Sequence, residues 1–121
     1  MVEIKADPEG HRMNITLDCA LTVIDFTRVI SQIQEESTSL EPGWTAAIDL
    51  RGMWIDDPFF IDQLRLLQQT IVECGAKKVG TLLDHVAIQM QLGQAGNKTR
   101  ANEIARRFYN LSEWEQFLAQ V

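Results

Sequence analysis

Four aspartates around one expected strand-to-helix junction are the residues best suited to acid–base or metal chemistry. Asp49 ends a predicted strand, and Asp56, Asp57 and Asp62 surround the start of the next helix. Active sites of α/β proteins lie at such strand ends, where carboxylates bind divalent metals or act as general acids and bases. The helix dipole also favours acidic residues in a first turn. Because no Cys or His accompanies them, we expect no metal site, and we interpret Asp57 as the helix N-cap.

His85 is a further candidate for catalysis because it follows another predicted strand end. It has no nucleophile paired with it in the sequence, and a single histidine at a helix start is typically a polar surface residue. We therefore expect no catalytic residue and no cofactor. An enzyme using Asp56, Asp57 or His85 remains a third hypothesis for the function.

A run of cationic side chains lies beside Gly93 and Gly96, and it consists of Lys98, Arg100, Arg106 and Arg107. It could hold an anion such as a lipid headgroup or a nucleotide phosphate. Neither a dinucleotide-binding glycine fingerprint nor a phosphate-binding P-loop is present. A solvated helix face is the usual meaning of such charges, so anion binding by Lys98, Arg100 and Arg107 is a secondary hypothesis.

Large apolar residues flank a short loop and the helix start after it, and they are Met53, Trp54, Ile55, Phe59 and Phe60. A loop cannot cover five such side chains. We assign Ile55 and Phe60 to the core. An aromatic and methionine patch is typical of an interaction surface, so Met53, Trp54, Asp57 and Phe59 are predicted to form an interaction surface or a pocket.

Composition limits the class of protein. The 121 residues are 45% hydrophobic and 23% charged, which indicates one globular domain spanning 1–121. The net charge of −6 argues against binding to nucleic acid or to an anionic membrane surface. No apolar stretch approaches the roughly 18 residues of a membrane span. Cys19 and Cys74 are too few for a disulfide framework, which favours a reducing cytoplasm.

The first half of the chain predicts a hairpin, two helices and a central strand. Residues 2–5 and 13–17 alternate in polarity around the turn at 7–10. Thr22 with Asp25 predicts a helix start, followed by one apolar face: Val23, Phe26, Ile30 and Ile33. The apolar run 44–50 suits a strand covered on both faces. Asp57-Pro58 predicts the next helix start, Gly75 its end, and one face of apolar residues: Phe60, Leu64, Leu67 and Ile71.

The second half predicts another strand at 77–83, a helix from about His85, and a further helical piece through Ala101, Ile104 and Ala105. A short strand or extended link follows at 108–109. Ser112 with Glu115 predicts a capping box for a last helix, whose buried face is Trp114, Phe117, Leu118 and Val121. The expected fold is α/β, with a mixed four- to five-stranded sheet that opens with an antiparallel hairpin, continues with parallel strands and is covered by helices.

This order of elements resembles the STAS or SpoIIAA-like group, the fold of bacterial anti-sigma-factor antagonists and of Sec14-related lipid-binding domains. The resemblance covers nearly the whole chain in element order. In sequence it is concentrated in the segment Ala47 to Pro58 and in the ending from Arg107-Phe108-Tyr109-Asn110 to Trp114, Phe117 and Leu118. That ending is similar to the finish of small bacterial SpoIIAA-like proteins of unassigned role.

The chain departs from the antagonists at the start of the helix after Asp49. Antagonists carry a phosphorylatable serine in an Asp-Ser-Ser/Thr-Gly stretch, and the matching residues here are Asp56-Asp57-Pro58-Phe59. Asp57 cannot accept a phosphate from a serine kinase, and a carboxylate carries less charge than a phosphate. The sequence therefore removes the kinase switch that the resemblance implies.

Three hypotheses for the function follow. The first is a non-enzymatic binding or regulatory module, homodimeric or bound to another protein, that acts through the Met53–Phe60 surface. The second, suggested by the Sec14-related proteins, is a small lipophilic-ligand or lipid-binding protein with an internal apolar cavity. The third is the enzyme described above.

Overall fold

The computed structural model describes residues 2–17, 23–51, 58–83 and 105–119. Within these residues, one five-stranded sheet has the spatial order β1-β2-β3-β4-β5, which is also the order along the chain. The strands are β1 (Val2–Asp7), β2 (Arg12–Leu17), β3 (Trp44–Asp49), β4 (Ala76–Leu82) and β5 (Ala105–Phe108). β1 is antiparallel to β2, and the other neighbours are parallel. The predicted α/β class and mixed sheet are confirmed.

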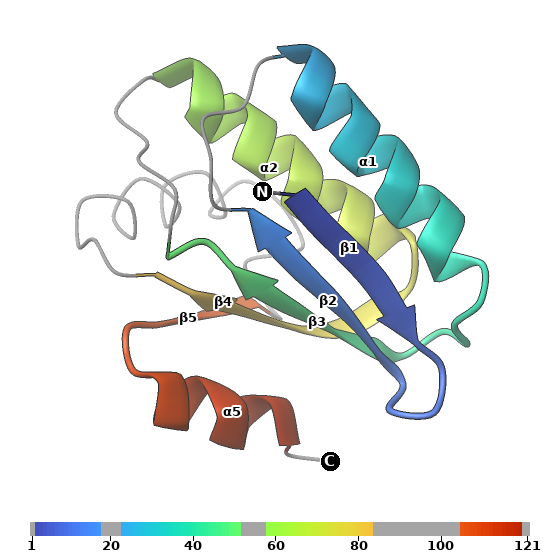
Figure 1. The fold of residues 1–121 in the computed structure, drawn as a ribbon, viewed down its shortest axis with the longest axis vertical. Helices are drawn as coiled ribbons and strands as arrows, with labels where there is room; N and C mark the ends of the chain where they lie inside the picture. The colour runs from blue at the N-terminus through green and yellow to red at the C-terminus, as the bar shows by residue number, and fades with distance from the viewer. Residues whose placement is uncertain (1, 18–22, 52–57, 84–104, 120–121) are drawn as a thin grey trace.

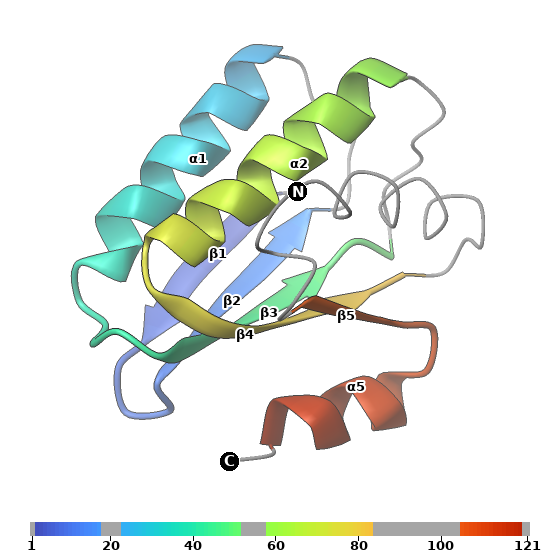
Figure 2. The ribbon, with the colours of Figure 1, turned by 180° about the vertical axis from the view of Figure 1, so that it is seen from behind.

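The described helices cover the two faces of the sheet unequally. They are α1 (Val23–Ser37), α2 (Pro58–Glu73) and α5 (Leu111–Ala119). Figure 1 shows α1 and α2 side by side on one face, with α5 on the other, and Figure 2 shows the same layers from behind. α5 contacts β4 and β5. The opposite face of the sheet, under α1 and α2, therefore carries the main core.

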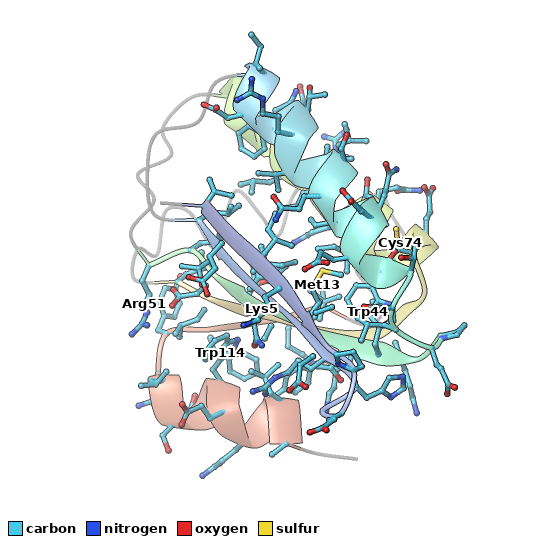
Figure 3. The ribbon with its side chains drawn as sticks, turned by 45° about the vertical axis from the view of Figure 1, so that its right-hand side comes forward. Lys5, Met13, Trp44, Arg51, Cys74 and Trp114 are labelled. Atoms are coloured by element: carbon cyan, nitrogen blue, oxygen red, sulfur yellow. The ribbon has the colours of Figure 1, made fainter. Side chains whose placement is uncertain are left out.

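The core forms where the alternating side chains of the strands meet the apolar stripes of the helices. Figure 3 shows Met13 and Trp44 on the α1 side of the sheet and Trp114 on the α5 side. The fully or nearly fully buried residues include Met13, Ile15, Leu17, Phe26, Val29, Ile33, Ile48, Leu64, Leu67 and Ile71. The predicted faces of α1 and α2 are confirmed at the residues just named, where Val29 joins them and Ile30 is only partly buried. Of the predicted face of α5, Leu118 is buried, whereas Trp114 and Phe117 are half-buried.

The turns follow the predicted glycine and proline signals. The Asp7 carboxylate accepts a hydrogen bond of 3.1 Å from the Gly10 N–H, which closes the β1–β2 hairpin. α2 begins at Pro58 and ends before Gly75, whose φ of +109° is accessible mainly to glycine. Gly43 also has a positive φ, of +94°, and its N–H donates to the Gly75 carbonyl at 2.7 Å. Two glycines thus join the end of α2 to the start of β3.

Two local predictions are wrong. Ala105, predicted in a helical piece, begins the strand β5, because its backbone pairs with Val79 of β4. The N-cap of α5 is Asn110 rather than Ser112: the Asn110 side-chain oxygen accepts a hydrogen bond of 3.1 Å from the Glu113 N–H. Asn110 and Glu113 have the same three-residue spacing as the predicted box. Because the cap is Asn110, the helix begins at Leu111, one residue before Ser112.

In the described part of the chain, no helix is long and apolar enough to cross a membrane.

Candidate anion-binding groove

A groove of about 800 Å³ opens at the end of the sheet where the β1–β2 hairpin turns. The parallel strands β2, β3 and β4 begin at this end, and Leu118 and Ala119 of α5 contribute one wall. Figure 1 shows the end of α5 and the hairpin turn on the same side of the molecule. The polar residues that line the groove are Asp7, His11, Arg12, Thr45, Lys77 and Lys78.

The strand register places three of these residues in one row. Arg12 on β2 is the partner of Thr45 on β3, and Thr45 is the partner of Lys78 on β4. Residues paired across neighbouring strands project from the same face of a sheet. Lys78 contacts α5, so all three side chains belong to the α5 face. The sheet therefore presents a guanidinium, a hydroxyl and an ammonium group side by side.

His11 extends this row at the end of the hairpin. Its φ of +54° is unusual for a residue with a side chain, and its backbone oxygen accepts a hydrogen bond of 3.0 Å from Thr45. The ring Nε2 lies 2.9 Å from the carbonyl oxygen of Glu41. His11 thus connects the hairpin to the turn before β3, and it lines the groove. The sequence around His11 predicts only the turn at 7–10.

The groove is a local concentration of positive charge in a chain with a net charge of −6. Arg12, Lys77 and Lys78 line it with one carboxylate, and that carboxylate, Asp7, already holds the hairpin turn. Within the described residues, the side chains of Arg12 and Lys77 form no hydrogen bond or ion pair. Their charges therefore remain available to an anion that enters the groove.

Lys78 has a second contact that links the groove to α5. Its ammonium donates a hydrogen bond of 2.7 Å to the carbonyl of Phe117 and lies 5.0 Å from the centre of the Phe117 ring. Burial lowers the pKa of Lys78 from its ordinary value, and the neighbouring charge of Lys77 lowers it further. A negative charge in the groove would offset this repulsion and favour the charged ammonium.

Most of the predicted interaction surface falls outside the described residues. This is the case for Met53, Trp54 and Asp57, and for Lys98 and Arg100 of the predicted anion site. Phe59 lies in α2, but its side chain is not among those described. Two of the candidates considered for catalysis, Asp56 and His85, also lie outside. These assignments stay predictions.

Arg107 is described, and it does not belong to the groove. It lies half-buried on β5 beside Thr81 of β4, while its neighbour Phe108 faces α5 and stacks on Phe117 at 5.1 Å. Alternation along the strand puts Arg107 on the opposite face, the side of α2. Among the described residues, its Nε and the Thr81 hydroxyl are buried without a hydrogen-bond partner.

The two candidate aspartates that the structure describes, Asp49 and Asp62, both have structural partners. Arg51 donates two side-chain hydrogen bonds to Asp49, of 3.1 and 2.8 Å. Partial burial acts to raise the pKa of Asp49, but these bonds and the charge of Arg51 outweigh it, so the pKa is lowered. Asp62 forms an exposed ion pair with Arg65 at 3.3 Å. In the described part of the chain, no three His, Cys, Asp or Glu residues group as metal ligands.

Comparison with known proteins adds no relative. The chain matches no family model, no curated protein and no solved structure. The groove itself is open to solvent and lined by charged residues, so it is not the internal apolar cavity that the lipophilic-ligand hypothesis requires. The hydrogen-bond donors that line it, on Arg12, Thr45, Lys77 and Lys78, suit an anion.

Proposed function

We propose that this protein is a non-enzymatic binding module that acts through protein contact and holds an acidic segment of its partner in the groove. The observation that carries the proposal is the row of Arg12, Thr45 and Lys78 across three strands, extended by Lys77 and His11. Guanidinium, ammonium and hydroxyl groups donate hydrogen bonds to carboxylates, and charge-assisted bonds are the strong ones.

The size and shape of the groove favour a chain segment over a small ion. Its volume of about 800 Å³ lies within the range of pockets that take drug-sized ligands. The wall formed by Leu118 and Ala119 offers apolar contact beside the cationic row. An acidic peptide segment with an apolar side chain would satisfy both parts of this lining.

The overall charge argues for a short acidic segment and against a long polyanion. A nucleic acid presents many phosphates, and those outside the groove would be repelled by a protein with a net charge of −6. A few carboxylates confined to the groove would contact only the cationic row. Electrostatic complementarity of this local kind sets orientation and association rate.

The binding test compares a groove variant with a charge-matched control. The probe is the fluorescein-labelled peptide Glu-Glu-Leu-Glu-Glu, a short acidic segment with one apolar side chain, and the readout is fluorescence anisotropy at low ionic strength. We expect the double variant Arg12→Gln, Lys77→Gln to raise Kd about tenfold or more, since two donors are lost. The double control Arg28→Gln, Arg106→Gln removes two exposed charges outside the groove, on α1 and β5, and should leave Kd within about twofold.

If Kd rises equally in the groove variant and in the control, the peptide is attracted to the charge of the protein as a whole. That result would contradict a groove site. A peptide that fails to bind the natural protein would also contradict the proposal.

We also propose that the chain is a cytoplasmic, SpoIIAA-like protein of bacterial type that acts as a homodimer through Met53, Trp54, Asp57 and Phe59. The opening antiparallel pair followed by parallel strands supports the family assignment, because the resemblance implies this arrangement. Light scattering after size exclusion tests the dimer. We expect Trp54→Ala with Phe59→Ala to yield a monomer, and an unchanged mass would remove the basis for this surface.

A further inference from the structure

We infer that α5 is a detachable wall of the groove and that occupancy of the groove holds it in place. This inference rests on the proposed function, because it concerns the regulation of the same site. Leu118 and Ala119 of α5 line the groove, so the complete site exists only when the helix is docked on the sheet. A ligand that needs this wall binds the docked state in preference to the undocked one.

The contacts of α5 are few. The helix has nine residues, and of these only Leu118 is buried among the side chains that the structure describes. Trp114 donates a hydrogen bond of 2.9 Å from Nε1 to the carbonyl of Gly80, and the ring of Phe117 packs on Phe108. A helix this short is not stable alone in water, so its order depends on docking. Elements with few buried contacts open at a lower free energy than the sheet does.

Lys78 couples the ligand to the helix. Lys78 lines the groove, and its ammonium donates to the Phe117 carbonyl at 2.7 Å in the last turn of α5. Helix carbonyls at that end lack partners within the helix and carry partial negative charge, so they attract a cation. An anion bound beside Lys78 offsets the repulsion between the Lys77 and Lys78 charges and so favours the position of the ammonium at the α5 carbonyl.

Lys77 and Lys78 form a matched pair for the test. They are neighbours in sequence and both line the groove, and it is the Lys78 ammonium that hydrogen-bonds to α5. Replacing Lys77 should therefore weaken the ligand without loosening the helix. Replacing Lys78 should do both.

Hydrogen exchange of the α5 amides measures the coupling, with the peptide Glu-Glu-Leu-Glu-Glu as the probe. For a ligand that binds only the docked state, peptide at ten times its Kd slows exchange by about tenfold. Lys77→Met removes a charge that repels Lys78, so it should not speed exchange without peptide, and it should show the same slowing at ten times its own, higher Kd. Lys78→Met keeps a long unbranched side chain without the ammonium, and it should exchange faster without peptide and gain less protection with it.

Each outcome separates this inference from the proposed function. Peptide that binds with unchanged α5 exchange would overturn the coupling and leave the groove as a binding site. Lys77→Met that speeds basal exchange as much as Lys78→Met would also overturn it. Peptide that does not bind the natural protein would overturn the proposed function, and this inference with it.

Discussion

Glu36 on α1 accepts a hydrogen bond of 3.4 Å from the backbone N–H of Ala6 on β1. Two residues away on the strand, the carbonyl of Ile4 accepts a hydrogen bond of 3.4 Å from the Gln32 side chain. β1 is an edge strand, and the outward backbone groups of an edge strand can pair with a strand of another chain. Two side chains from one turn of α1 therefore hydrogen-bond to two backbone groups of β1 at which a strand of another chain could pair.

The first prediction concerns self-association through this edge. Gln32→Ala with Glu36→Ala should free the two backbone groups and produce concentration-dependent association, measured by light scattering. The cost in stability should be only about 1 kcal/mol, because both bonds are long and partly exposed. Glu35→Ala, at an exposed position of the same helix, serves as the control for lost negative charge. Identical association of the two variants would contradict a specific role for the contacts to β1.

Side chains of α5 pack closely on Gly80 of β4, and the second prediction is that Gly80→Ala destabilises the protein. A Cβ there would lie 3.0 Å from Cδ2 of Phe117 and 3.1 Å from Cδ2 of Leu118. Removing a strand glycine stabilises by about 0.5–1 kcal/mol, whereas overpacking costs about 1–3 kcal/mol. We expect a net loss of about 1–2 kcal/mol in urea unfolding. A variant as stable as the natural protein would mean that α5 does not press on this strand.

The third prediction is a pH dependence that arises from Asp49 and Arg51. The pKa of Asp49 in the folded state lies below its ordinary value of 3.8, despite burial, because Arg51 stabilises the carboxylate. The unfolded state therefore binds the proton more readily, and the stabilisation is present above pH 3.8 and is lost as the pH falls through the folded-state pKa.

Urea midpoints measured from pH 6 down to pH 2 should therefore fall less steeply for Asp49→Asn than for the natural protein. Asp62→Asn, which removes an exposed ion pair, is the matched control and should leave the slope almost unchanged. Parallel curves for the natural protein and Asp49→Asn would contradict the role of Arg51.

The elements that the sequence predicted well are those with local causes. The hairpin follows from alternation around Asp7-Pro8-Glu9-Gly10, and the limits of α2 follow from Pro58 and Gly75. The continuous apolar run at 44–50 indicated a strand covered on both faces, and β3 is the central strand. In each case a few adjacent residues carry the signal.

Of the two wrong local predictions, the one at the N-cap of α5 is a choice between two nearby capping residues, and the one at Ala105 arose where tertiary pairing decides. Ala105 has high helix propensity, but pairing with Val79 places it in a strand. The groove was missed for the same reason. Arg12, Thr45 and Lys78 are far apart in sequence, and only the register of β2, β3 and β4 brings them into one row. A polar residue near the start of each strand was the available signal, but it does not specify the register.

The fourth prediction concerns the Thr81 hydroxyl. Thr81 is 1% exposed, and in the described part of the chain its hydroxyl has no hydrogen-bond partner. Valine has nearly the same shape and removes a buried polar group that is not satisfied. Thr81→Val should therefore raise the free energy of unfolding by up to about 1 kcal/mol. A loss of more than about 1 kcal/mol would indicate that the hydroxyl has a partner in the folded protein.

The groove is tested most directly by mapping where an acidic segment binds. Amide chemical shifts of isotope-labelled protein should be followed by NMR during titration with the peptide Glu-Glu-Leu-Glu-Glu. We predict that the largest changes fall on Arg12, Thr45, Lys77 and Lys78, with smaller ones at the end of α5. Changes centred on α1, or none at saturating peptide, would contradict the proposal that this groove is the binding site.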